Sequence, residues 1–188
     1  MTSTVVFWAL AAILLFWGIG AYNRLVRLRA EAKAAFALLD AELTRDVELV
    51  RHQLPQADTQ ASGVENDHSV WAGLRGAAEQ FAASLAAARN RPLNAEGIAA
   101  LGAARDVMAM AWERAERSDA HDLGGPHLAA TVLARRSQIL AQANAAADQF
   151  NRAVARYNAA IAEFPAVLLA SFFGFRPGRG IDLPDVDA

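Results

Sequence analysis

The stretch LAQANAAADQFNRAVARYNAAIAEF, from Leu140 to Phe164, decides the fold. Its apolar residues recur at alternating steps of three and four, at Leu140, Ala143, Ala147, Phe150, Val154, Tyr157, Ile161 and Phe164. This spacing is a heptad pattern with apolar a and d positions, and it predicts a helix that buries one side against other helices. Upstream the register is lost and Arg136 falls on a nominal d position, which indicates a stutter or a frayed start.

Two columns of residues flank this apolar seam. The g positions carry small residues, at Ala146, Ala153 and Ala160, and the e positions carry amides, at Asn144, Asn151 and Asn158. The buried face is therefore wide, which is typical of a helix in a bundle. We expect the asparagine amides to hydrogen-bond across the seam to a neighbouring helix, because a buried amide left unpaired costs about 1–3 kcal/mol.

Three more helices precede this one. The first carries an apolar stripe from Leu25 to Leu54 and ends at Pro55, and the second fits residues 69–88. The third begins after Asn94, a plausible N-cap, and buries a stripe of Ile98, Leu101, Ala104, Met108 and Trp112. Aromatic residues at helical spacing usually face the core, so Trp71 and Trp112 are expected to be buried.

The stretch VVFWALAAILLFWGIGAY, Val5 to Tyr22, has no charged residue and is close to the length that crosses a bilayer. A cleaved signal peptide is the rival interpretation, but the preceding residues contain no Lys or Arg, so we favour an uncleaved anchor. Basic residues follow at once, at Arg24, Arg27, Arg29 and Lys33. The positive-inside rule then predicts a short N-terminus outside and the remainder in the cytoplasm.

These elements predict an all-α protein in which a transmembrane helix continues into an antiparallel four-helix bundle with long first and last helices. We divide the chain into an anchor (1–22), a helical bundle (23–165) and an apolar membrane-proximal segment with a flexible C-terminal tail (166–188). An even number of long passes brings the end of the last helix back beside the start of the first. The predicted bundle base is therefore Tyr22, Asn23, Asn151, Tyr157 and Asn158.

The segment after Pro165 is almost wholly apolar but too short to span a bilayer. It would emerge beside the membrane surface, followed by two arginines suited to anionic headgroups. Its predicted lipid-interface residues, which we call the foot, are Leu168, Leu169, Phe172, Phe173, Phe175 and Arg176. The alternative is that these side chains simply pack onto the end of the bundle.

Composition and motifs bound the function. Lys and Arg number 18 against 20 acidic residues, a net charge of −2, so no basic face for nucleic acid is expected. The chain contains no cysteine, which excludes disulfides and thiolate metal sites. None of the four histidines, His52, His68, His121 and His127, lies in a known metal-binding motif. Glu113 and Glu116 lack a histidine companion, and we expect them to form a solvated face with Arg114 and Arg117 of the same helix. We expect no metal, no cofactor and no catalytic residue.

Two stretches carry a family resemblance. AYNRLVRLRAEAKAAFALLDAEL (Ala21 to Leu43) has a tyrosine–asparagine pair just after the membrane, a leucine–arginine step, an aromatic residue and an aspartate. FNRAVARYNAAIAEFPAVLLASFFGF (Phe150 to Phe175) has asparagines seven apart, then phenylalanine–proline and phenylalanine–glycine–phenylalanine. On these residues the chain resembles the LemA family. The middle region diverges, with TRDVELVRHQLP (44–55) in place of the family's usual segment.

The resemblance implies a bacterial inner-membrane protein with a cytoplasmic helical bundle and no established enzymatic activity, an accessory or scaffold protein linked to envelope stress or membrane proteolysis. Its expected partners are the lipid bilayer and other membrane or membrane-associated proteins. Two alternatives stay open. The alanine and asparagine columns could face a second copy in a homo-oligomer, or a metal could sit in the bundle core of an enzyme.

Overall fold

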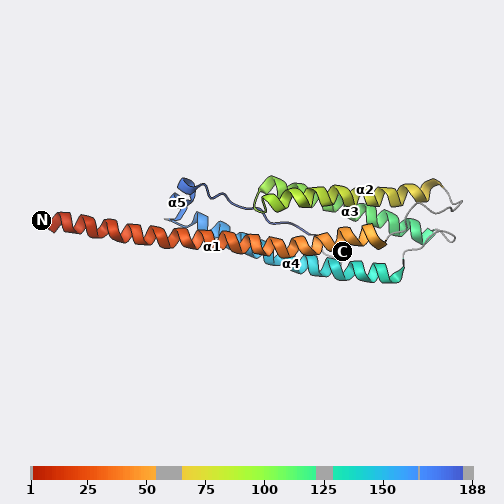
Figure 1. Ribbon diagram of the computed structural model, residues 1–188, viewed down its shortest axis with the longest axis horizontal. Helices are drawn as coiled ribbons and strands as arrows, with labels where there is room; N and C mark the ends of the chain where they lie inside the picture. Colours follow the sequence, from red (N-terminus) through yellow and green to blue (C-terminus); the bar gives the residue numbers. More distant parts are fainter. Residues whose placement is uncertain (1, 54–64, 122–128, 165, 184–188) are drawn as a thin grey trace.

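The computed structural model describes residues 2–53, 65–121, 129–164 and 166–183, and in these ranges the regular secondary structure is entirely helical. The five helices are α1 (Thr2–Gln53), α2 (Glu65–Asn90), α3 (Ala95–His121), α4 (Ala130–Ala162) and α5 (Ala166–Phe173). Successive long helices run in opposite directions (Figure 1). The expected N-cap of α3 is confirmed, since Asn94 Oδ1 accepts a hydrogen bond from the Gly97 backbone N–H at 2.7 Å.

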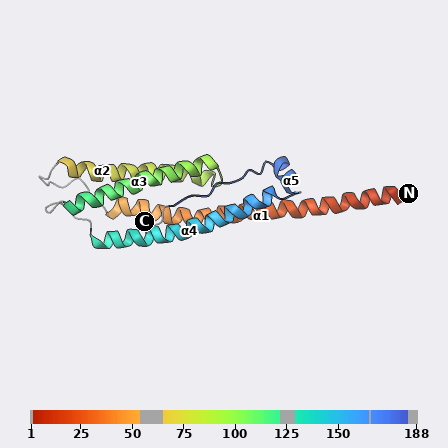
Figure 2. The same ribbon diagram turned by 180° about the vertical axis from the view of Figure 1, so that it is seen from behind.

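The long helices form two closely packed pairs, α1 with α4 and α2 with α3, and α2 also contacts α1 (Figures 1 and 2). All four contribute to one hydrophobic core. At its centre the Phe36 ring meets the Phe150 ring edge-on, with centroids 5.5 Å apart. Trp71 and Trp112 are both buried, as the apolar stripes predicted.

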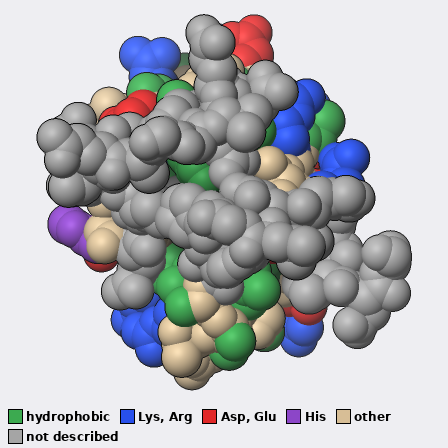
Figure 3. Space-filling model, turned by 90° about the vertical axis from the view of Figure 1, so that its right-hand side faces the viewer, with side chains coloured by type: hydrophobic (Ala, Val, Ile, Leu, Met, Phe, Trp, Pro, Cys, Tyr) green, Lys and Arg blue, Asp and Glu red, His purple; other side chains and the backbone are tan. Residues whose placement is uncertain are grey.

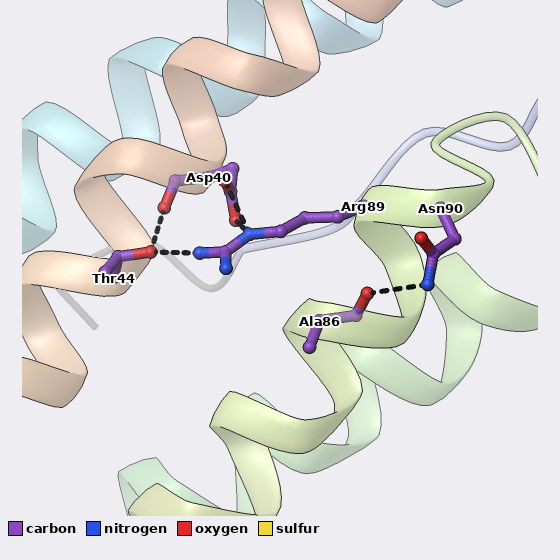
Figure 4. Close-up of polar contacts among 5 residues, drawn as sticks. All are labelled: Asp40, Thr44, Ala86, Arg89 and Asn90. Carbon is purple, nitrogen blue, oxygen red and sulfur yellow. Dashed lines mark hydrogen bonds and ion pairs between the residues drawn. The ribbon is translucent and has the colours of Figure 1, made fainter.

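The α1–α2 contact is closed by a polar cluster. Arg89 Nε donates to both carboxylate oxygens of Asp40, at 2.7 and 2.8 Å, and Arg89 Nη2 donates to Thr44 Oγ1 at 2.7 Å (Figure 4). The threonine hydroxyl in turn donates to the backbone oxygen of Asp40. Asp40, the aspartate of the LemA-like stretch, is thus hydrogen-bonded within the chain and joins α1 to α2.

The N-terminal part of α1 extends beyond all the other helices (Figures 1 and 2). Among the described helices, α1 alone is long and apolar enough to cross a membrane by length and composition, and none of its most apolar stretch is buried. The large side chains there, including Phe7, Ile13 and Phe16, are exposed. This is the segment predicted to be the anchor.

The opposite end of the molecule has a different surface. In the part that the structure describes, Figure 3 shows basic and acidic side chains distributed around the outline, with hydrophobic side chains between them. Charged residues are therefore not gathered on one side of that end. Among the described residues, the projecting part of α1 and helix α5 carry most of the exposed large apolar side chains.

Candidate functional site

The last long helix returns to the point where α1 leaves the other helices. A second hydrophobic cluster forms there from Leu25 and Leu28 of α1 with Tyr157, Ala160 and Ile161 of α4. The predicted return of the last helix to the start of the first is confirmed. An exposed ion pair, 2.8 Å apart, joins Arg24 of α1 to Glu163, the residue that follows the end of α4.

The short helix α5 covers this junction with its small residues. Ala166 and Ala170 are buried against α1 and α4, whereas most of the large residues of α5 are exposed. Phe172 is 82% exposed and Leu168 is 63% exposed. In water a helix normally buries its large apolar side chains and exposes its small or polar ones, so this orientation is the reverse of the usual one.

A glycine turn ends α5 and aims the chain back along the molecule. Gly174 has a φ of 70°, and the Phe175 N–H donates to the Ala170 oxygen at 2.9 Å. These are the features of a Schellman motif, in which a glycine takes the left-handed conformation that other residues rarely adopt. The turn brings Phe173 and Phe175 against Tyr22, with ring centroids 4.9 and 6.0 Å away.

Beyond this turn the chain runs alongside α4 without regular secondary structure, away from the projecting part of α1 (Figure 1). We call residues 174–183 the C-terminal segment. The Tyr157 hydroxyl donates to the Arg176 backbone oxygen at 3.0 Å. The Asn158 amide grips Gly178 from both sides: its Nδ2 donates to the Gly178 oxygen and its Oδ1 accepts from the Gly178 N–H, at 2.8 and 2.9 Å.

Asn151 holds the same segment further along. Its amide donates to the Ile181 oxygen and accepts from the Ile181 N–H, again at 2.8 and 2.9 Å. The distance between the two asparagines along α4 matches the distance between their partners in the C-terminal segment. Seven helical residues rise about 10.5 Å, and three extended residues span about 10 Å. Ile181 is buried in the main core, so the C-terminal segment is part of the folded structure up to Leu183.

Two glycines allow this close approach. A Cβ at Gly180 would lie 2.5 Å from Asn151 Oδ1, and one at Gly178 would lie 3.2 Å from a methyl group of Leu93. Any larger residue at position 180 would displace the asparagine that holds the segment. Burial raises the pKa of the Tyr157 hydroxyl beside this segment, while the charge of Arg29 acts in the opposite direction.

Several details of the predicted site need correction. The expected partner of the asparagine column was a neighbouring helix, but Asn151 and Asn158 bond to the chain's own C-terminal segment. Asn144 does not share this role, and its Oδ1 is buried without a hydrogen-bond partner among the described residues. Phe164 was placed on the seam, but α4 ends at Ala162 and Phe164 is 81% exposed.

The remaining predicted site residues lie at the same end. Asn23 is exposed on α1, and Tyr22 is 38% exposed beside α5. Of the foot, Leu168, Phe172 and Phe173 are exposed and Leu169 is partly buried. Arg176 is exposed, and Phe175 is partly buried beneath the Arg29 guanidinium, whose carbon lies 5.8 Å from the ring centroid. Pro165 and residues 184–188 lie outside the described residues.

A buried polar cluster that periodicity did not reveal joins α1, α3 and α4. Asp46 and Arg105 are both more than 90% buried, and Arg136 stacks over the Trp112 ring, 4.6 Å from its centroid. Desolvation raises the pKa of Asp46, opposed by the charges of Arg136 and Arg105. Desolvation also lowers the pKa of Arg105. Arg136, at the stutter position, thus contacts α3 from within α4, which begins upstream at Ala130, so this part of the helix is not a frayed start.

Arg136 also corrects the predicted face of α3. Its Nη1, on α4, donates to Glu116 Oε1, on α3, at 2.9 Å, although Glu116 was expected to pair with arginines of its own helix. Glu113 does pair locally, with Arg117. Within the described ranges no group of three His, Asp or Glu residues is placed to hold a metal ion. His127 lies outside those ranges, and His52 is exposed.

Comparisons of this chain with protein-family models, with curated proteins and with solved structures find no match. The resemblance to the LemA family therefore stays a prediction from the two quoted stretches.

Proposed function

We propose that this chain is a single-pass membrane-anchored accessory or scaffold protein of the LemA type, with an antiparallel four-helix bundle on the cytoplasmic face of a bacterial inner membrane. One observation carries the proposal. Helix α5 buries Ala166 and Ala170 and exposes Leu168, Phe172 and Phe173, beside the place where the apolar part of α1 leaves the other helices. Such an orientation is unfavourable in water and favourable at a lipid surface.

The size of the effect supports this proposal. Transfer of one large apolar side chain from water to an apolar environment is worth about 1.5–3 kcal/mol. The foot exposes three such residues, and the projecting part of α1 exposes many more. A bilayer around residues 5–22 with the foot in its interface removes both surfaces from water at once. It also sets the adjoining basic residues at the headgroups, as the positive-inside rule requires.

The bundle would act by presenting its outer helical faces to membrane or membrane-associated proteins, and the LemA resemblance suggests a link to envelope stress or membrane proteolysis. A homo-oligomer is the alternative. Its simplest form would use the alanine and asparagine columns of α4, but Ala146, Ala153 and Ala160 are buried within the chain, and Asn151 and Asn158 hold the C-terminal segment. Self-association would have to use another surface.

Because the chain lacks cysteine, single cysteines can be introduced for site-specific labels. The test attaches a spin label at Phe172→Cys of the full chain in phosphatidylcholine nanodiscs and measures its access to oxygen and to a water-soluble nickel chelate. We expect the label at 172 to be oxygen-accessible and shielded from nickel. The matched control is Met110→Cys, an exposed apolar position on α3, which should remain nickel-accessible. Equal nickel access at both positions would reject the foot.

Topology needs a separate measurement. A protease added to spheroplasts should leave a C-terminal tag intact if the bundle is cytoplasmic, and should remove it after the membrane is disrupted. Cleavage in intact spheroplasts would reverse the proposed orientation.

A further inference from the structure

Two adjoining pockets make a groove from the foot to a group of basic residues that begins at Arg29. The first is lined by Tyr22 and Val26 of α1 and by Phe173 and Phe175, with Arg29 and Lys33 at one end. The second, of about 290 Å³, shares those two cations and continues to Arg91, Tyr157 and Arg176. The groove thus changes from aromatic and aliphatic walls to basic walls along its length.

The basic end is unusual because its charges are not compensated. Arg29, Lys33, Arg91 and Arg176 all line the second pocket, and none forms an ion pair within the described ranges. No Asp or Glu is among the described residues that line either pocket. Nearby arginines differ: Arg89 is paired with Asp40 (Figure 4), and Arg27 and Arg156 both contact Glu31.

The depth of the basic end suits a lipid headgroup. Arg29 lies seven residues after Tyr22, a rise of about 10 Å along the helix. The polar layer on each side of the hydrocarbon core is about 5–7 Å thick. An extended arginine side chain bridges the difference by keeping its stem on the apolar surface while its charged head reaches the phosphates.

From these observations we propose that the groove binds an anionic phospholipid. Its phosphate is held by Arg29 and Lys33 with Arg91 and Arg176, and its acyl chains lie along Tyr22, Val26 and Phe173. This proposal rests on the proposed membrane foot, because only a foot at the bilayer surface brings the groove to lipid. Anionic lipid is the occupant that fits, since the walls combine four uncompensated cations with an aromatic, aliphatic surface that a free inorganic anion would leave uncovered.

The experiment uses the full chain in neutral detergent and counts bound lipid by native mass spectrometry. The probes are phosphatidylglycerol, phosphatidylcholine with the same acyl chains, and inorganic phosphate as a competitor. We expect tighter binding of phosphatidylglycerol than of phosphatidylcholine, with no displacement by inorganic phosphate at matched concentration. Equal binding of the two lipids would overturn the proposal, and displacement by inorganic phosphate would assign the site to a free anion instead.

Variants separate a built site from general attraction of charge. Arg29→Gln with Lys33→Gln should weaken phosphatidylglycerol binding by about 25-fold, at about fivefold for each cation near an anionic surface. The control is Arg114→Gln with Arg135→Gln, which removes the same charge from exposed positions far from the groove. An equal loss in both double variants would overturn the proposal.

The two proposals fail in different ways. If the spin label at position 172 inserts into phosphatidylcholine nanodiscs while phosphatidylglycerol shows no preference, the headgroup site is wrong and the foot stands. If the label does not insert, the foot itself is wrong.

Discussion

Replacement of Asn151 by alanine tests whether the asparagine column of α4 holds the C-terminal segment. The change removes two hydrogen bonds to Ile181, at 2.8 and 2.9 Å. At about 1 kcal/mol for each bond, the attached state of the segment loses about 2 kcal/mol relative to the detached state. Since 1.4 kcal/mol is a factor of ten, detachment becomes about 30-fold more frequent.

Hydrogen exchange is the suitable assay, because detachment of the segment is a local opening that leaves the long helices intact. Protection of the amides in residues 176–183 should fall about 30-fold in Asn151→Ala, whereas protection in α1 and α4 stays unchanged. Full-chain protein in neutral detergent can be compared with the variant by mass spectrometry of the C-terminal peptide.

Asn144→Ala is the matched control, because it makes the same chemical change one heptad earlier in the same column. Both variants gain the same helix propensity from alanine, so this term cancels between them. Asn144 forms no bond to the C-terminal segment, and its Oδ1 is buried without a partner among the described residues. Equal protection of residues 176–183 in the two variants would refute the reasoning.

Three further predictions follow from the same geometry. Gly180→Ala should detach the C-terminal segment as Asn151→Ala does, because the new Cβ displaces the Asn151 amide. The double variant should lose no more hydrogen-exchange protection than either single variant, and additive losses would contradict this. Desolvation raises the pKa of Asp46 in the folded state above its ordinary value of 3.8. Between pH 3.8 and the raised pKa, the folded state therefore binds more protons at Asp46 than the unfolded state does. The contribution of Asp46 to stability against urea should fall as the pH rises through this range. Asp46→Asn should lack this fall. A variant with the same pH profile of urea stability as the parent protein would contradict a raised pKa at Asp46. Arg24→Gln should change stability to urea by less than about 0.5 kcal/mol, because the ion pair with Glu163 is more than half exposed; a larger loss would show that the pair is stronger than its exposure implies.

The buried face of α4 could be predicted from the sequence because its period is fixed by helix geometry. Ala143, Phe150 and Tyr157 lie at heptad spacing and are all buried. The pattern failed at its two ends. Phe164 continues the heptad spacing in the sequence, but α4 ends at Ala162, shortly before Pro165. The spacing alone therefore could not predict whether Phe164 is buried. Arg136 broke the period, yet it is held by Trp112 and Glu116, which come from another helix and cannot be inferred locally.

The partner of the asparagine column was not predictable from α4 alone. A buried amide needs a hydrogen-bond partner, but this requirement does not specify whether the partner belongs to a helix or to an extended segment. The missing signal lay in the C-terminal segment, where Gly178 and Gly180 are followed by Ile181. Glycines at this spacing permit close approach to a helix, and three extended residues match one heptad of rise. The seven-residue spacing of the asparagines and the three-residue spacing from Gly178 to Ile181 together would have indicated that the C-terminal segment contacts α4.

Whether the orientation of α5 is favourable depends on its surroundings. Residues 166–173 are so apolar that either face could have been buried, and the sequence left packing onto the bundle as an open alternative. The helix packs through Ala166 and Ala170 because small side chains let it lie close to α1 and α4. That close approach places Leu168 and Phe172 on the outside, where water would penalise them. Packing and solvation therefore conflict if the surroundings are aqueous, and they agree if the surroundings are lipid.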